Sequence, residues 1–115
     1  MQTEPQIHFH GLDRSPALEA AIQDGITSLE DIGAEIVSCQ VTVERPGQEH
    51  RHGNPYHLSV RVHVAGEDIV VSHDPTPKYT ADAHEDPYLA VKDVFATTKR
   101  RVRKLNDKRR DRRRH

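Results

Sequence analysis

The chain has 115 residues, enough for one domain with a modest core, and it is polar, with 34% hydrophobic and 30% charged residues. No apolar run approaches the roughly 18 residues of a membrane span, and the N-terminus lacks the pattern of an export signal. Cys39 is the only cysteine, which excludes an internal disulfide. Together these features predict a soluble cytoplasmic protein.

A net charge of −1 conceals a strong asymmetry along the chain. Residues 1–98 contain 6 basic and 16 acidic residues, whereas residues 99–115 contain 11 basic and 2 acidic residues. This distribution predicts a basic end that meets a polyanion, because neutralised phosphates release counterions. The alternative is a solvated tail that only aids solubility.

The first half of the chain predicts a strand, a helix and a second strand. Residues 6–9 alternate, and Ser15-Pro16 then supplies an N-cap and a first-turn proline for a helix that ends near Asp31. Gly25 in the middle of this helix predicts a close packing contact. Residues 36–44 alternate again, with Val37, Cys39, Val41 and Val43 facing inward.

The second half predicts a hairpin and a long helix. Residues 56–65 and 68–73 alternate on either side of a tight turn. From Asp86-Pro87, apolar residues recur every three or four positions up to Leu105. No apolar residue follows, so we expect one α+β domain over 1–105 and a basic disordered arm over 106–115.

The order β-α-β-β-β-α predicts a four-stranded mixed sheet with both helices on one face. The right-handed crossover rule makes the first two strands parallel if they are neighbours. The other face would be wet and lined by polar residues, namely His8, Gln40, Thr42, Ser59, Arg61 and His63.

The residues offer little support for catalysis or a metal site. The nine histidines raise the hypothesis of a metal site. Structural zinc sites, however, normally also contain cysteines at defined spacing, so we prefer the interpretation that the histidines are solvated. Cys39 is interpreted as a buried small hydrophobe rather than a nucleophile. We find no phosphate loop, nucleophile elbow or zinc-protease helix, and therefore predict neither an enzyme nor a cofactor, a metal or a small-molecule substrate.

The last helix carries cations away from its apolar stripe, and these are the candidate phosphate contacts. They are Lys92, Lys99, Arg100, Arg103 and Lys104 on the helix, followed by Lys108, Arg109, Arg110, Arg112, Arg113 and Arg114 on the expected arm. The alternative is a solvated helix face.

The start of this helix resembles a known family. His84-Glu85-Asp86-Pro87-Tyr88-Leu89-Ala90-Val91 is similar to the H-E-D-x-Y-x-A-I signature of ribosome hibernation promoting factors and ribosome-associated inhibitor A, also called sigma-54 modulation proteins. Further along the helix, the family's R-x-L-x-K-L pattern is similar to the pattern formed by Arg100, Val102, Lys104 and Leu105. The start of the first helix, Ser15-Pro16-Ala17-Leu18, is similar to the family's T-P-A-I. The first helix departs from the family, since it has Glu19, Gly25, Ser28 and Asp31 where relatives are basic.

The resemblance implies a short-form, ribosome-associated translation inhibitor with a fold like the double-stranded-RNA-binding domain. It implies binding to 16S rRNA of the 30S subunit in the tRNA and mRNA channel, under stress or in stationary phase. Two alternatives remain open: a general RNA-binding module, and a histidine-based metal-binding protein. A free sheet edge would also permit self-association.

Overall fold

The computed structural model describes residues 2–11, 13–44, 57–73 and 87–113, and its elements follow the predicted order. The strands are β1 (Gln6–His10), β2 (Ile36–Glu44), β3 (His57–Val64) and β4 (Glu67–His73). The helices are α1 (Pro16–Glu30) and α2 (Pro87–Arg113). The predicted α+β class and the β-α-β-β-β-α order are confirmed.

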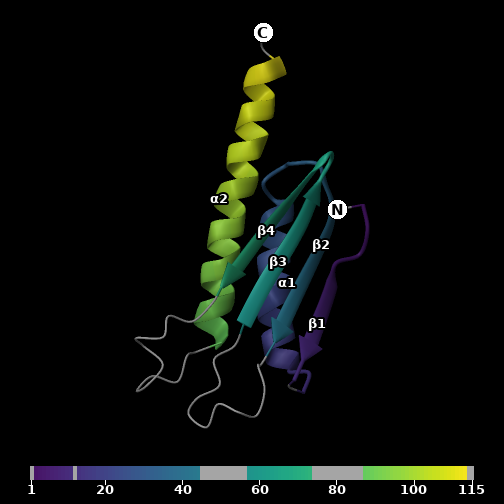
Figure 1. The fold of residues 1–115 in the computed structure, drawn as a ribbon, viewed down its shortest axis with the longest axis vertical. Coiled ribbons are helices and arrows are strands. Elements are labelled where there is room, and N and C mark those ends of the chain that lie inside the picture. Colours follow the sequence, from purple (N-terminus) through teal and green to yellow (C-terminus); the bar gives the residue numbers. More distant parts are fainter. Residues whose placement is uncertain (1, 12, 45–56, 74–86, 114–115) are drawn as a thin grey trace.

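The four strands form one sheet in the order β1-β2-β3-β4 (Figure 1). β1 pairs with β2 in parallel, as the crossover rule predicts, and the other two pairs are antiparallel. Gly66 forms the turn between β3 and β4 with a φ of 84°, a conformation that favours glycine.

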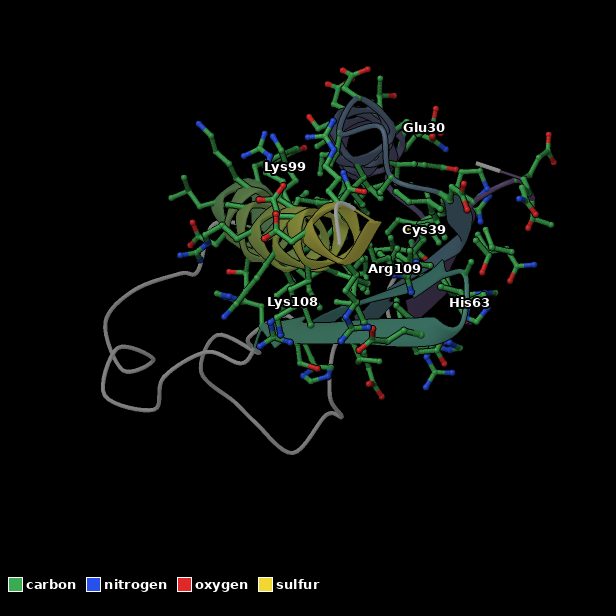
Figure 2. The ribbon with its side chains drawn as sticks, turned by 90° about the horizontal axis from the view of Figure 1, so that it is seen from above. Glu30, Cys39, His63, Lys99, Lys108 and Arg109 are labelled. Carbon is green, nitrogen blue, oxygen red and sulfur yellow. The ribbon has the colours of Figure 1, made fainter. Side chains whose placement is uncertain are left out.

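Both helices cover the same face of the sheet (Figure 2). α1 packs near β2, and α2 packs on β3 and β4. The apolar stripe of α1, formed by Leu18, Ile22, Ile26 and Leu29, is buried against the alternating inward residues of the strands. Thr98 is the one buried polar residue among those described, and its Oγ1 donates to the carbonyl of Val94 at 2.7 Å.

The capping of α1 follows its sequence. Ser15 has extended backbone angles, and its side chain accepts a hydrogen bond from the backbone N–H of Leu18 at 3.2 Å. Pro16 occupies the first turn, where its missing N–H has no partner to lose. The helix ends at Glu30, with Asp31 as the C-cap, as predicted.

Two local predictions are wrong. Val37 is half-buried and Ile36 is buried in its place, because the pairing of β2 with β3 shifts between Ile36 and Ser38. The second concerns residues 106–113, which continue α2 as a helix rather than form a disordered arm. Tertiary anchoring is the physical reason, since the Arg109 guanidinium donates through Nη2 to the carbonyl of Ala65 at 2.7 Å.

Candidate nucleic-acid interface

Seven of the cations of α2 divide between two flanks of the helix. At 3.6 residues per turn, one row falls on the flank that faces α1, and a second row falls on the flank that faces β4. We call them the α1-side row (Lys92, Lys99, Arg103 and Arg110) and the β4-side row (Lys104, Lys108 and Arg112). In Figure 2, Lys99 and Lys108 project from opposite flanks of α2.

The α1-side row borders a cleft between the two helices, where Lys92 and Lys99 lie across from Asp24 and Ser28. The β4-side row borders a second cleft, where Lys104 and Lys108 share the lining with Glu67 and Asp68. The two rows therefore have acidic neighbours on different elements.

Within the described part of the chain, no cation of either row forms an ion pair within 4.0 Å. All of them are exposed except Lys99, which is half-buried. Unpaired cations on one rigid helix match the charge of a phosphate backbone. Contacts with phosphates contribute to binding affinity without recognising the nucleotide sequence. The predicted basic helix face is thus present, as two rows.

Three arginines are partly engaged by the protein itself. Arg100 donates through Nη2 to Thr97 Oγ1 at 3.1 Å, and Arg109 donates to the turn between β3 and β4. Arg101, which the sequence did not single out, donates through Nη1 to the carbonyl of Val70 on β4 at 3.0 Å. Its position on the β4 flank follows from helical spacing, but the carbonyl partner depends on packing.

Some candidate residues lie outside the described part of the chain. These are Arg114 and the signature residues His84, Glu85 and Asp86, while the side chain of Arg113 is also not described. Of the remaining signature residues, Ala90 is buried on the core face of α2, and Tyr88 is exposed at the cleft between the helices.

The histidines of the sheet make local contacts. His63 Nδ1 lies 2.6 Å from Asp68 Oδ1 across β3 and β4, and the rings of His8 and His10 stack at 6.3 Å. Among the described residues, no three His, Cys, Asp or Glu side chains gather closely enough to hold a metal ion. His50, His52 and His84 lie outside the described residues.

Cys39 lies in the core beneath α1, with 2% of its surface exposed. Burial raises the pKa of its thiol to about 11, and the nearby charge of Glu30 adds to the increase. The thiolate is the reactive form of cysteine, so this environment disfavours nucleophilic chemistry.

No helix in the described residues is both long and apolar enough to cross a membrane. The long helix α2 is instead dense in charge from Lys99 onward.

Comparison with known proteins identifies the family. The family model described as "Sigma 54 modulation protein / S30EA ribosomal protein" matches residues 6–110. No curated protein matches the chain.

Two solved structures share the fold. A ribosomal subunit interface protein from Coxiella burnetii has a TM-score of 0.65 and 17% identity, over 90% of this chain and 97% of that chain. The N-terminal domain of Thermus thermophilus Protein Y has a TM-score of 0.64 and 13% identity, over 87% and 94%. The fold and the match over residues 6–110 together show that this chain belongs to the Sigma 54 modulation protein / S30EA ribosomal protein family.

Proposed function

We propose that this protein associates with the 30S ribosomal subunit and contacts 16S rRNA through the two cation rows of α2. The site would be the channel used by tRNA and mRNA, so that occupancy inhibits translation under stress or in stationary phase. Family membership supports association with the ribosome. The observation that carries the contact surface is the set of unpaired cations along α2.

The first helix takes a smaller part in this proposal. Between Pro16 and Asp31 the chain has no Lys or Arg, and Asp24, Glu30 and Asp31 are exposed. Carboxylates near phosphates repel them, so the cations of α2 must supply the attraction. The proposal therefore assigns the contact with rRNA to α2 rather than to the first helix, where relatives carry basic residues.

Sedimentation with 30S subunits at rising salt tests the proposal. Each phosphate contact that is lost lowers the slope of log affinity against log salt by about one. Two variants with equal charge compare the rows: Lys99→Gln/Arg103→Gln/Arg110→Gln and Lys104→Gln/Lys108→Gln/Arg112→Gln. We expect the first variant to lose more slope, because two acids, Glu67 and Asp68, line the cleft beside the second row, whereas Asp24 alone lines the cleft beside the first.

Absence of binding at low salt would contradict the proposal, and so would a slope that neither variant changes. Competition with bulk double-stranded RNA separates ribosome binding from general RNA binding. A specific ribosomal protein should prefer 30S subunits, whereas equal affinity for the two competitors would favour the general binder.

A further inference from the structure

The cleft between α1 and α2 has an apolar floor and a volume of about 460 Å³. Ala21 and Gly25 of α1 and Val91 and Phe95 of α2 form this floor, and Ala96 lies on the α2 rim. A Cβ atom at position 25 would lie 2.6 Å from the Phe95 ring, so glycine allows the ring to sit against the backbone of α1. The volume falls within the roughly 300–1,000 Å³ of small-molecule sites.

The two rims of the cleft differ in chemistry. The α1 rim presents Asp24 and Ser28, which lie four residues apart and thus on one face of the helix. The α2 rim presents Lys92 and Lys99, separated by about 10.5 Å along the helix axis. Neither lysine pairs with Asp24 within 4.0 Å, so hydrogen-bond acceptors face cations across an apolar floor.

We propose that this cleft holds one unstacked nucleotide of a single-stranded RNA. Its phosphate lies toward Lys92 and Lys99, its base covers the apolar floor, and the edge of the base donates to Asp24. The inference rests on the proposed function and deepens it, because it assigns a site on α2 to a particular form of RNA. Unstacked bases in loops and ends are the usual targets of specific RNA recognition.

The chemistry of the rims favours a nucleotide over an acidic peptide. Both would bring an anion to the lysines, but only a base combines a flat apolar face with hydrogen-bond donors on its edge. Guanine is the best match for a carboxylate acceptor, because its N1–H and N2 amino group donate side by side. Arg103 and Arg110 continue the α1-side row beyond the cleft, where neighbouring phosphates of the same strand can follow.

A cleft-filling variant of the full chain tests this site. Ala96 is exposed on the α2 rim, so Ala96→Leu fills the cleft without entering the core. Ala20→Leu is the matched control, because Ala20 is exposed on α1 and does not line the cleft. In fluorescence polarisation with a short labelled RNA that has one guanosine among uridines, we expect Ala96→Leu to weaken binding about tenfold. The control should bind like the wild type.

A second variant tests the orientation of the nucleotide, in which the edge of the base lies at Asp24. Asp24→Asn should weaken the preference for the guanosine probe over an all-uridine probe, because an amide NH2, which donates, replaces one of the two carboxylate oxygens that accept from N1–H and the N2 amino group. Free guanosine monophosphate serves as competitor, and displacement at the same concentration as unlabelled RNA would overturn the assignment to RNA. An unchanged preference in Asp24→Asn would overturn the assigned orientation.

The proposed function and the cleft can fail separately. If Ala96→Leu binds the probe like the wild type while the row variants lose 30S subunits, the cleft inference is wrong and the proposed function stands. If the row variants keep full 30S binding while Ala96→Leu loses the probe, the cleft binds RNA and the proposed ribosomal contact is wrong.

Discussion

At residue 25, close packing against the Phe95 ring requires glycine although the residue lies in a helix. Helix propensity favours alanine over glycine by about 1 kcal/mol, yet an added Cβ would overlap the Phe95 ring at 2.6 Å. We expect Gly25→Ala to destabilise the protein by about 1–3 kcal/mol, because the ring is buried and has little room to move. Urea unfolding measures the change.

A matched variant separates packing from propensity. Gln23→Ala introduces alanine at an exposed position of the same helix and should be neutral or slightly stabilising. Replacing the Phe95 ring by a smaller leucine side chain should also relieve the clash. Gly25→Ala should therefore lower the free energy of unfolding less in a Phe95→Leu background than in the wild type. An equal cost in both backgrounds would show that the contact with Phe95 is not the cause.

Cys39 gives a second prediction at the same scale. Its pKa is raised to about 11, so the folded protein holds the thiol neutral at pH values where an unfolded cysteine begins to ionise. The resulting stabilisation is present below pH 9.0, the ordinary value, and is lost as the pH rises toward about 11. The urea midpoint of the wild type should fall over this window more than that of Cys39→Ala.

Alkylation gives an independent check of the same residue. Iodoacetamide reacts with the thiolate, so Cys39 should remain unmodified in the folded protein and react once urea unfolds it. Mass spectrometry counts the modified chains. Rapid modification without denaturant would contradict the buried, neutral thiol.

At the scale of the element, the last turns of α2 show what a sequence pattern can and cannot predict. Alternation and apolar periodicity predicted each strand and helix, because every one of them buries a face in the same core. After Leu105 no apolar residue remains, so periodicity gave no sign of helix. The anchor is instead a hydrogen bond from Arg109 to a carbonyl 44 residues earlier in the chain, which no local pattern records.

The sequence also predicted part of the candidate site. The cations of α2 are visible as a charge count, and their placement off the apolar stripe follows from helical spacing. Their division into two rows depends on which flank meets α1 and which meets β4, and this is set by tertiary packing. The irregularity after Ile36 was likewise hidden, because a shift in strand pairing breaks the alternation that reveals a strand.

The role of Arg109 as an anchor leads to a prediction for the end of α2. Arg109→Ala removes the hydrogen bond to Ala65, and we expect faster amide hydrogen exchange over the last turns and a loss of about 1 kcal/mol in their local stability. Arg110→Ala removes the same charge from an exposed position and should leave exchange nearly unchanged. Equal fraying in the two variants would mean that charge rather than the anchor holds these turns.

At the scale of the whole molecule, exposed acids and exposed cations meet at one end of the fold. The C-terminal end of α1 and the cationic end of α2 lie at the same end of the sheet (Figure 1). Glu30 and Asp31 are exposed there. Both lie at the negative end of the α1 helix dipole, where negative charge is unfavourable. These two acids therefore weaken both the helix and any field that attracts a polyanion.

Neutralising these acids tests how the molecule approaches its partner. At separations of about 10 Å, one charge in water contributes roughly 0.4 kcal/mol, so Glu30→Gln/Asp31→Asn should tighten binding to 30S subunits about two- to fourfold at low salt. The gain should vanish at high salt because screening removes it. Asp13→Asn/Glu44→Gln is the matched control, because both residues are exposed, Glu44 is the last residue of β2 and Asp13 comes shortly before the start of α1. Those ends of β2 and α1 lie at the opposite end of the sheet (Figure 1). Equal effects of the two pairs would mean that net charge alone governs the approach, whereas a larger effect at Glu30 and Asp31 would place the phosphates beside the end of α1.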